Sequence, residues 1–372
     1  MLTVFIPKEV EARVAATPET VALMKKAGLQ IIVQKGAGER AFFSDESYKQ
    51  AGARIGKAKA DIILAVQPPK DLHPGATLIS LPPDNSTLKA YQKKQITFLS
   101  MNHIPRTSAA QKMDALTSQS NIAGYKAVIM AAAHLPKIFP LTMTAAGTLH
   151  PVKVLILGAG VAGLVAAATA KRLGAVVEVS DIRIAVKEQV ESVGASFIGI
   201  AQTGSEDVSG YAKEASADFA KRQEEEITKH LSGTDVVITT ALVPGKKAPV
   251  LINEKQVRLM KPGSVIIDLA AEQGGNCALT RPGKIIKKNG ITIDATLNLP
   301  GTVPRHSSEM YAKNVFGLLE AIVKEGKISI DINDGIIAAV LVMHNGKLNE
   351  GSLRKEDKGV HEGKRWEESD KK

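Results

Sequence analysis

Short apolar runs alternate with amphipathic stretches along most of the chain. Runs of this length are typical of buried strands, and apolar residues at helical spacing between them indicate helices. The early runs predict strands at 2–6, 31–34, 62–66 and 96–99, with helices at 44–51 and 85–94. The later runs predict strands at 154–157, 236–239, 264–268 and 291–294. Strands that alternate with helices form mainly parallel sheets, so the pattern predicts an α/β fold.

Two segments interrupt this alternation. Residues 139–151 contain prolines and a glycine and are typical of a connector, and residues 299–304 mark a second crossing. We therefore expect two Rossmann-like domains with parallel sheets separated by a cleft, the first of them discontinuous in sequence. The first domain is expected at 1–120 plus 305–343, and the second at 121–304.

Further local patterns complete the expected fold. Thr17-Pro18-Glu19 has the residues of a helix start. Residues 109–135 predict a long helix that is interrupted or kinked near Gly124, and residues 307–324 predict another helix. The apolar runs 328–332 and 336–343 flank Asn333-Asp334-Gly335, which predicts a hairpin. The polar tail 344–372 is rich in charges of both signs and is expected to be disordered.

Residues 153–183 carry the most specific motif of the chain. An apolar run ends in Gly158-Ala-Gly160-Val-Ala-Gly163, a helix pattern follows, and a second apolar run ends on Asp181. This order of strand, glycine turn, helix, strand and acid predicts dinucleotide binding, with the pyrophosphate at the helix N-terminus. A carboxylate at Asp181 would accept the ribose hydroxyls of NAD and repel the 2′-phosphate of NADP. The alternative is a glycine turn that serves only packing.

Composition narrows the class of protein. The 372 residues are 44% hydrophobic and include one cysteine, Cys277, which excludes an internal disulfide and fits a reducing compartment. No signal peptide is evident at the N-terminus, and the longest apolar runs are too short to span a bilayer, so a soluble protein is expected. The net charge of +10 favours an anionic ligand or a negatively charged membrane surface. With 4% aromatic residues and no basic-aromatic run, nucleic acid is not an expected partner.

Two polar segments stand out as candidates for chemistry. In segment 105–126, Arg106, Gln111 and Asp114 can converge on one ligand, since residues three apart share a helical face. The alternative for this segment is a solvated helix with a surface ion pair. Residues 201–218 form a long polar stretch that is either a functional lid or a mobile surface loop, with Tyr211 as its large aromatic residue.

Several long blocks of sequence carry a family resemblance. The chain resembles the NAD(H)-binding component of proton-translocating nicotinamide nucleotide transhydrogenase, and it is similar to the related alanine dehydrogenase. The resemblance runs from Met1 to about Val342. Its most specific blocks are EARVAATPETV, PRTSAAQKMDALTSQSNIAGYKAV, MTAAGT, the glycine motif, SDIRIAVKEQVESVGASFI, GYAKE, ITTALVPGKKAPVLI and MKPGSVIIDLAAEQGGNC.

The resemblance implies roles for individual residues. Arg106 and Asp114 would contact the nicotinamide end of NAD(H), and Gln111 would reach the partner nucleotide at the site of hydride transfer. Thr117 stands where the family commonly has a serine near the carboxamide. The residues implied to bind the cofactor are Gly158, Gly160, Val161, Gly163, Asp181, Ile182, Arg183, Thr117, Tyr211, Ala241 and Leu242. No metal ligand set is implied.

The resemblance also implies partners. NADP(H) would be held by a separate NADP(H)-binding subunit, and a membrane-spanning subunit would form the proton channel. The chain would be cytoplasmic, would lie at the inner membrane through these subunits, and would form a homodimer.

A stand-alone amino-acid dehydrogenase remains the main alternative. Such an enzyme needs an acid/base group to take protons from the amine and to polarise an imine. The alanine dehydrogenase pattern has a lysine where this chain has Gln67 and a histidine in the region that reads 79–83 here, and its acid before the paired glycines appears as Glu272. Only Arg13 matches the carboxylate-binding arginine. Hydride exchange between two nicotinamides moves no proton at the reacting carbons and fits the residues better. A non-catalytic NAD-binding module is a third interpretation.

Overall fold

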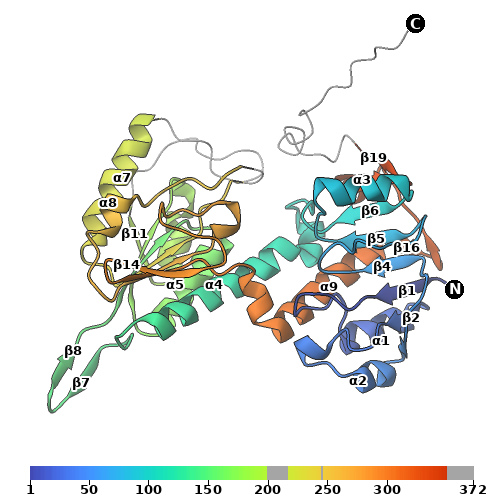
Figure 1. Ribbon diagram of the computed structural model, residues 1–372, viewed down its shortest axis with the longest axis horizontal. Helices are drawn as coiled ribbons and strands as arrows, with labels where there is room; N and C mark the ends of the chain where they lie inside the picture. Colours follow the sequence, from blue (N-terminus) through green and yellow to red (C-terminus); the bar gives the residue numbers. More distant parts are fainter. Residues whose placement is uncertain (199–216, 244–245, 350–372) are drawn as a thin grey trace, which may run out of the picture. The chain divides into compact units, whose positions relative to one another are not determined.

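The computed structural model describes residues 1–198, 217–243 and 246–349, with the main chain alone for 217–220. Contacts between Cα atoms divide the chain into two compact units. Unit 1 contains Met1–Gln119 and Gly301–Lys372, and unit 2 contains Ser120–Pro300 (Figure 1). Each unit has its own sheet and its own cores.

Unit 1 is built on an eight-stranded sheet in the order β19-β18-β6-β5-β4-β1-β2-β3. The six strands from β3 to β6 are parallel, and β18 and β19 continue the sheet in antiparallel pairing. The strands are β1 (Thr3–Ile6), β2 (Gln30–Val33), β3 (Arg54–Ile55), β4 (Ile62–Leu64), β5 (Thr77–Ser80), β6 (Thr97–Ser100), β18 (Leu341–His344) and β19 (Lys347–Leu348). The short pair β16 (Val323–Lys324) and β17 (Lys327–Ile328) forms a separate ribbon.

Two apolar layers enclose this sheet. Helices α1 and α9 bury residues such as Met24 and Tyr311 in one core, and α3 buries Tyr91 in the other. The helices of unit 1 are α1 (Pro18–Lys26), the 3-10 helix η1 (Glu39–Ala41), α2 (Asp45–Gln50), α3 (Asn85–Lys93), the 3-10 helix η2 (Ser108–Met113), α9 (Pro304–Ile322) and α10 (Gly335–Val340). The start of α1 is as predicted, because the Thr17 hydroxyl caps the helix and Pro18 occupies its first turn.

Unit 2 is built on a seven-stranded sheet in the order β11-β10-β9-β12-β13-β15-β14. All pairs are parallel except that of β14 with β15. The strands are β9 (Lys153–Leu157), β10 (Val176–Ser180), β11 (Ser196–Ile198), β12 (Val236–Thr239), β13 (Val265–Asp268), β14 (Ile285–Lys288) and β15 (Ile291–Asp294). Strands β7 (Thr142–Thr144) and β8 (Gly147–Leu149) form a separate hairpin.

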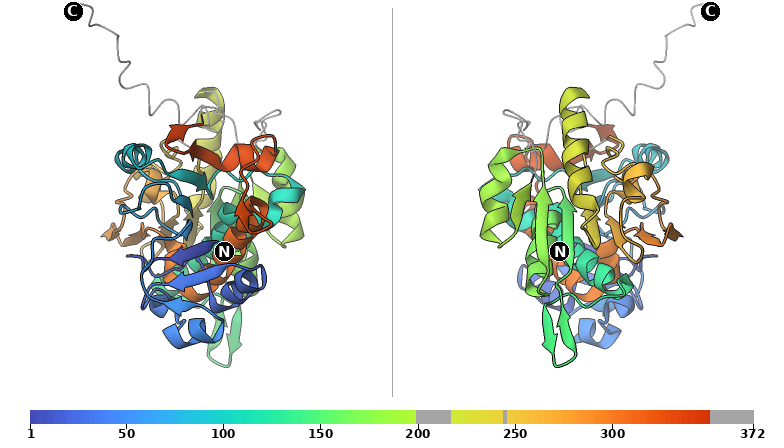
Figure 2. Two further views of the ribbon diagram at one scale, coloured as in Figure 1. Left: turned by 90° about the vertical axis from the view of Figure 1, so that its right-hand side faces the viewer. Right: turned by 90° about the vertical axis from the view of Figure 1, so that its left-hand side faces the viewer.

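Helices cover both faces of this second sheet (Figure 2). One core contains alanines of α4 and α5, and the other contains Ile227 and Leu231 of α7 with Val257 of α8. The helices of unit 2 are α5 (Val161–Arg172), the 3-10 helix η3 (Ile184–Val186), α6 (Lys187–Ser192), α7 (Ala217–Leu231), α8 (Glu254–Val257) and the 3-10 helix η4 (Ala271–Gln273). The 3-10 helix η5 (Leu299–Thr302) contains the division between the units at Pro300. Helix α4 (Ala115–His134) begins in unit 1 and ends in unit 2.

The predicted kink at Gly124 is wrong. Segment 109–135 breaks at Asp114, between η2 and α4, and α4 runs through Gly124. The Asp114 carboxylate accepts hydrogen bonds from the amide nitrogen of Thr117 at 2.9 Å and from its hydroxyl at 2.6 Å, and so caps α4. Gly124 instead permits close packing, because a Cβ there would lie 2.2 Å from the carbonyl oxygen of Ala162 in α5.

The predicted hairpin at 328–343 is also wrong. Asp334 does not form a turn between two paired strands but caps α10, and its Oδ1 accepts the amide hydrogens of Ile336 at 2.8 Å and Ile337 at 3.2 Å. The apolar run therefore begins as a helix that buries Ile337 and Val340, and only then becomes β18 beside β6.

Two other segments differ from the expectation. The connector at 139–151 contains the hairpin of β7 and β8, whose residues are mostly exposed. The polar tail is ordered as far as β19, which pairs with β18, and residues 350–372 lie outside the described part of the chain. Within the described residues, no helix is long and apolar enough to cross a membrane.

Candidate functional site

The topology of unit 2 directs attention to one edge of its sheet. From β9 the chain crosses to β10 on one side and later to β12 on the other, so β9 and β12 are neighbours at a switch point. In sheets of this kind, ligands bind beyond the carboxyl ends of the strands at the switch point. The predicted residues that follow β9, β10 and β12 therefore share one edge.

The glycine turn after β9 is shaped by close packing on one side and open space on the other. Gly158 has φ +108°, and a Cβ there would lie 2.5 Å from the Thr240 hydroxyl. A Cβ at Gly163 would lie 1.9 Å from the carbonyl oxygen of Gly158, so α5 can pack on the turn only without a side chain. A Cβ at Gly160 would meet no atom within 4 Å.

The first turn of α5 borders this open space. Gly160 is the N-cap residue and provides no side-chain hydrogen bond, and Val161 begins the helix. Amide hydrogens at a helix N-terminus favour a bound anion such as a phosphate. The structure thus combines an open backbone approach with donors suited to a pyrophosphate.

Asp181 lies buried at the end of β10, against the same turn. Its Oδ2 accepts a hydrogen bond from the amide of Ala159 at 2.7 Å, and both oxygens are bonded to the Arg183 guanidinium at 2.9 Å. Burial alone would raise the pKa of Asp181, but the hydrogen bonds and charge of Arg183 outweigh it and hold the pKa below its usual value. The carboxylate is therefore ionised at neutral pH and faces the glycine turn.

The loop after β12 carries Ala241 and Leu242. The Thr240 hydroxyl donates to the carbonyl oxygens of Gly158 at 3.0 Å and Leu157 at 3.3 Å, which fixes the loop beside the glycine turn. Ala241 is held on its other side by the buried side chain of Asn276. Leu242 is 38% exposed at the surface.

Two residues of this edge were missed by the sequence analysis. Asp268, at the end of β13, accepts hydrogen bonds from Thr239, Ala270, Asn276, Cys277 and Thr280. Asn276 joins it to the loop after β12. Both residues belong to the block MKPGSVIIDLAAEQGGNC, which carries the resemblance without implying roles for them. Glu272 of the same block accepts a hydrogen bond from the amide of Asn298 at 2.8 Å.

The other predicted residues lie in unit 1, elsewhere in unit 2, or outside the described part of the chain. Arg106 and Gln111 are exposed, with Gln111 in η2, while Asp114 and Thr117 are joined at the start of α4. Asp114 follows η2 with non-helical backbone (φ −71°, ψ 87°), so it does not continue the helical face of Gln111. Ile182 and Val161 are half-buried in unit 2. Tyr211 and residues 199–216 lie outside the described part of the chain.

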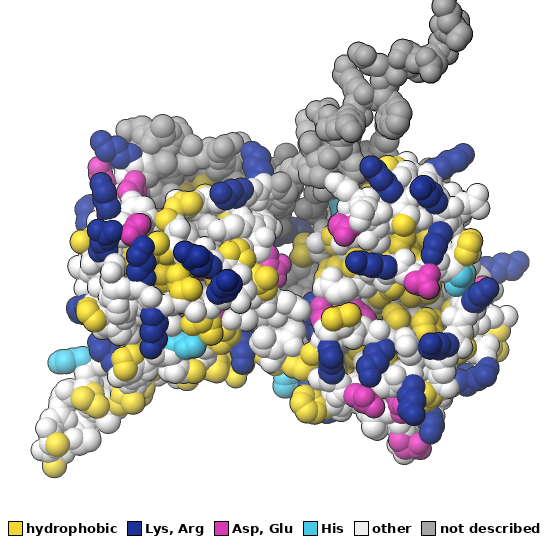
Figure 3. Space-filling model, in the orientation of Figure 1, with side chains coloured by type: hydrophobic (Ala, Val, Ile, Leu, Met, Phe, Trp, Pro, Cys, Tyr) yellow, Lys and Arg dark blue, Asp and Glu magenta, His cyan; other side chains and the backbone are white. Residues whose placement is uncertain are grey.

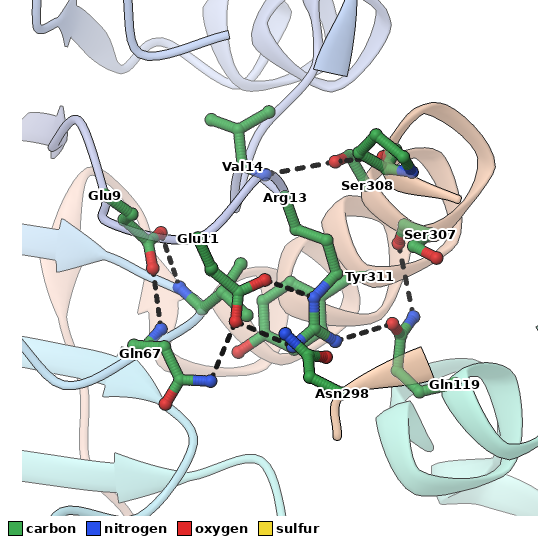
Figure 4. A network of polar contacts seen from close by, with 12 residues as sticks. Glu9, Glu11, Arg13, Val14, Gln67, Gln119, Asn298, Ser307, Ser308 and Tyr311 are labelled. Atoms are coloured by element: carbon green, nitrogen blue, oxygen red, sulfur yellow. Dashed lines mark hydrogen bonds and ion pairs between the residues drawn. The ribbon is translucent and has the colours of Figure 1, made fainter. Parts of the chain in front are cut away.

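A second polar cluster follows β1 and β4 in unit 1 (Figure 4). The Glu9 carboxylate accepts the amide hydrogens of Val66 at 2.8 Å and Gln67 at 2.7 Å. The Arg13 guanidinium is bonded through two nitrogens to Glu11, and its Nη1 donates to Gln119 at 2.7 Å. The Gln67 side chain also donates to Glu11, at 2.8 Å.

The Arg13 guanidinium separates the pKa values of these two buried carboxyl groups. Burial raises the pKa of Glu9 to about 7, although hydrogen bonds from Gln67 and Val66 oppose it. Glu11 is also desolvated, but its hydrogen bonds with Arg13 and the Arg13 charge bring its pKa below the usual value. Arg13 is thus paired with an ionised carboxylate of its own chain.

The described residues contain neither a thiol that is ionised at neutral pH nor a cluster of metal ligands. Burial raises the pKa of Cys277 to about 11, so its thiolate is scarce at neutral pH. No group of three metal-ligating side chains occurs in the part of the chain that the structure describes. Lysines and arginines are spread over the visible face of each unit in Figure 3 and do not gather into one patch there.

The geometry defines a class of protein with two Rossmann-like α/β units and an open glycine turn in the second. The N-terminal and C-terminal domains of the family described as alanine dehydrogenase/PNT match residues 5–123 and 127–351. The first segment of the divided NAD(P) transhydrogenase subunit alpha from Rhodospirillum rubrum is 44% identical to the chain over 374 residues, covering 93% of this chain and 97% of that protein.

A solved structure of a transhydrogenase is also similar to this chain. The transhydrogenase from Sinorhizobium meliloti has a TM-score of 0.85 and 38% identity, covering 93% of this chain and 99% of the other. The alanine dehydrogenase of Mycolicibacterium smegmatis is less similar, with 28% identity over 379 residues, covering 95% of this chain and 96% of that protein. The chain belongs to the alanine dehydrogenase/PNT family.

Proposed function

We propose that this chain is the NAD(H)-binding component of a proton-translocating NAD(P) transhydrogenase, passing hydride between NADH and NADP⁺ held on a partner subunit. The observation that carries the proposal is the open turn at Gly160, which lies before the uncapped N-terminus of α5 and beside the ionised Asp181. The likeness to transhydrogenase subunits over nearly the whole chain favours this reaction among those that use a nicotinamide nucleotide.

The residues of unit 2 fit a bound NAD(H). Gly158, Gly160, Val161 and Gly163 would hold the pyrophosphate, because open space and helix N–H groups meet there. Asp181, with Ile182 and Arg183, would bind the adenosine ribose and disfavour a 2′-phosphate. Ala241 and Leu242 would line the nucleotide on the β12 side, and Tyr211 would close over it.

The residues of unit 1 would orient the reacting ring. NADH would give a hydride, with its two electrons, to NADP⁺, and the products would be NAD⁺ and NADPH. No proton would be transferred at either reacting carbon. Arg106 and Asp114 would hold the ring of NADH, Thr117 would lie near its carboxamide, and Gln111 would extend towards the partner nucleotide. Alignment of this kind can account for much of the rate of a transfer between two bound rings.

An amino-acid dehydrogenase is the second candidate, because Arg13 occupies the position of a carboxylate-binding arginine and a dehydrogenase is 28% identical. In unit 1, however, Arg13 already has carboxylate and amide acceptors from Glu11 and Gln119. Gln67 cannot act as a general base, since a carboxamide does not gain or lose a proton near neutral pH. The arrangement therefore favours hydride exchange over oxidation of an amine.

The proposal includes partners and a location. The NADP(H)-binding subunit and a membrane-spanning proton channel would be separate chains, and the protein would be cytoplasmic and attached to the inner membrane through them. Coupling of hydride transfer to proton movement would take place in those subunits.

We also propose a homodimer, and the exposed apolar side chains suggest where its contact lies. Residues 336–343 pack within unit 1 and are not a free apolar surface. The β7–β8 hairpin has exposed apolar side chains instead, with Met143 75%, Leu141 53% and Leu149 53% exposed. Apolar side chains gathered on a projecting hairpin suit contact with a second copy.

Two assays of the purified protein test the proposal. Mixed with an NADP(H)-binding partner domain, it is expected to transfer hydride from NADH to an NADP⁺ analogue. Alone with alanine and NAD⁺, it is expected to produce no NADH. Steady NADH production from alanine, without transfer to NADP⁺, would replace the proposal by the dehydrogenase.

A further inference from the structure

The loop that leaves β12 lies against the glycine turn and has little freedom to move without affecting it. A Cβ at Gly158 would lie 2.5 Å from the Thr240 hydroxyl and 3.2 Å from the Ala241 amide nitrogen. The turn and the loop therefore already meet at van der Waals distance. A displacement of Ala241 towards β9 would push on the glycine turn, and a displacement away would open a gap beside it.

Asn276 fixes the position of Ala241 from the opposite side. Its side chain is 0% exposed and lies 35 residues further along the chain. The Asn276 Oδ1 accepts the amide hydrogen of Ala241 at 3.0 Å, while its Nδ2 donates to the Ala241 carbonyl at 2.9 Å. The same Nδ2 donates to the carbonyl oxygen of Pro249 at 2.7 Å. One side chain thus satisfies both main-chain groups of Ala241 and joins the two ends of the loop.

The main chain of Asn276 is itself held rigidly. Its amide donates to the Asp268 carboxylate at 2.8 Å. Its carbonyl accepts main-chain hydrogen bonds from the amides of Leu251 at 2.8 Å and Ile252 at 3.0 Å. The preceding Gly275 has φ +88°, and a Cβ there would lie 2.6 Å from an oxygen of Asp268, so this close approach requires glycine. The carboxamide is therefore presented to the loop from a fixed base.

We propose that Asn276 is a positioning residue for the nucleotide, and that its carboxamide sets the distance between the Ala241 main chain and the glycine turn. The inference rests on the proposed function, because it assumes that NAD(H) binds at this turn. It adds to that function a residue that would not touch the ligand. A planar carboxamide presents a donor and an acceptor side by side, and it satisfies the N–H and the C=O of Ala241 together.

Asn276→Asp tests this role with almost no change of shape. The ionised carboxylate loses both donors and faces the carbonyl oxygens of Ala241 and Pro249, so the loop should move away from the turn. A protonated carboxyl keeps one donor and one acceptor, and the native contacts should return as the pH falls. We expect NADH to bind about 10- to 100-fold more weakly at about pH 8.5, with most of the loss recovered near pH 6.

The surroundings of position 276 make this pH profile interpretable. The titratable side chains packed around it are Asp268, which accepts its amide hydrogen, and Cys277, whose pKa burial raises to about 11. Lys247 lies beside Gly274, where a Cβ would be 3.1 Å from its Cε. All three are present in the wild-type protein, so the difference between the two pH profiles isolates the carboxyl at position 276.

Two further variants serve as controls. In Asn349→Asp the lost amide also bridges two main-chain carbonyls, those of Leu341 at 2.9 Å and Ala338 at 3.4 Å, but in unit 1. This variant should bind NADH as the wild type does at every pH. Asn276→Ala removes the hydrogen bonds without adding a charge, so it should weaken binding equally across the pH range, and it keeps the test available if Asn276→Asp does not fold.

The outcomes separate the inference from the function on which it rests. If the wild-type protein binds no NADH, the proposed function fails. If the wild type binds NADH and both Asn276 variants bind it with unchanged affinity, the inference is overturned and the function stands. Weak binding by Asn276→Asp with no recovery at low pH, together with a lowered melting temperature at every pH, would reduce Asn276 to a structural role.

Discussion

The two units have the same strand order, but the loops at their switch points differ in chemistry. In unit 1 the order β3-β2-β1-β4-β5-β6 puts the loops after β1 and β4 side by side, and in unit 2 the order β11-β10-β9-β12-β13 does the same for β9 and β12. In unit 2 this point holds glycines, and a Cβ at Gly160 would meet nothing within 4 Å. In unit 1 it holds Glu9, whose carboxylate binds the amides of Val66 and Gln67.

The difference shows that the strand order provides a location and the loops decide its use. Main-chain donors are available at the switch point of both units. In unit 2 the Ala159 amide is bonded to Asp181, but the first turn of α5 borders open space at Gly160, whereas in unit 1 the amides of Val66 and Gln67 are both satisfied by Glu9. Substitutions in the two units should therefore have different consequences, and we expect the largest at Gly163.

Gly163→Ala should abolish the open turn of unit 2. Its Cβ would lie 1.9 Å from the carbonyl oxygen of Gly158, so α5 must move away from β9. We expect a loss of about 3 kcal/mol in the free energy of unfolding, together with loss of NADH binding. Gly160→Ala is the matched control for packing, because its Cβ enters open space at φ −74°, and it should weaken binding while the melting temperature stays unchanged. A Gly163→Ala protein as stable as the wild type would contradict the packing argument.

Gln111→Asn should separate the contributions of the two units. The side chain is exposed on η2 of unit 1, and the substitution shortens it by one methylene group. Hydride transfer with the partner domain is expected to fall about a hundredfold, because small misplacements near reacting atoms are costly. NADH affinity should stay unchanged, since the binding determinants proposed here lie elsewhere. Gln50→Asn, at another exposed site of unit 1, should transfer hydride at the normal rate, and equal rates for Gln50→Asn and Gln111→Asn would remove Gln111 from the reaction.

Asp181→Asn should reduce the preference of unit 2 for NADH. The substitution removes the charge that pairs with Arg183 and faces the glycine turn. NADH affinity is expected to fall about tenfold, while the guanidinium becomes available to a 2′-phosphate, so the ratio of NADPH to NADH affinity should rise. Titration calorimetry with both nucleotides measures this ratio, and an unchanged ratio would show that Asp181 does not select the cofactor.

Glu9→Gln should reveal how the titration of the Glu9 carboxyl group affects the stability of unit 1. The folded protein raises the pKa of Glu9 from 4.5 to about 7, so the stability linked to this group is fully present below pH 4.5 and is lost as the pH rises through 7. Relative to the variant, we expect the wild type to lose about 1 kcal/mol of unfolding free energy for each pH unit between about pH 5 and pH 7. Denaturant titrations over this range measure the effect.

The exposed Glu39 gives a control for this titration. Glu39→Gln, with a side chain 61% exposed, should leave the pH dependence of stability as it is in the wild type. If the wild type and Glu9→Gln have parallel stability curves, Glu9 does not titrate in this range.

The sequence predicted those parts of the fold that local chemistry determines. Thr17 and Pro18 begin α1 because their cap and backbone preferences act within one turn. Strands β9, β12 and β15 follow their apolar runs closely, since a fully buried strand has no polar face to obscure its ends. The motif around Gly158 and Gly163 was recognisable because its spacing is fixed by the turn itself.

The errors arose where a distant contact decides what a residue does. The sequence predicts a kink at Gly124, but the glycine is instead required for close packing against Ala162 in another helix. Asp334 and Gly335 fit a hairpin turn and a helix cap equally well, and the burial of Ile337 and Val340 favours the helix. Asn276 gave no local signal, because its hydrogen bonds join segments 35 and 27 residues apart. No spacing rule connects residues of that kind.

The single thiol of the chain provides a built-in reporter of local opening. Cys277 is 2% exposed and follows Asn276 directly, with its amide bonded to Asp268 at 3.1 Å. A thiol in this state reacts with an alkylating reagent only when unit 2 opens around it, so the rate of modification measures the free energy of that opening. The rate reports on unit 2 separately from the unfolding of unit 1, because the chain has no other cysteine. A nucleotide bound at the glycine turn would slow modification in proportion to its own occupancy, which gives its affinity without any label added to the protein.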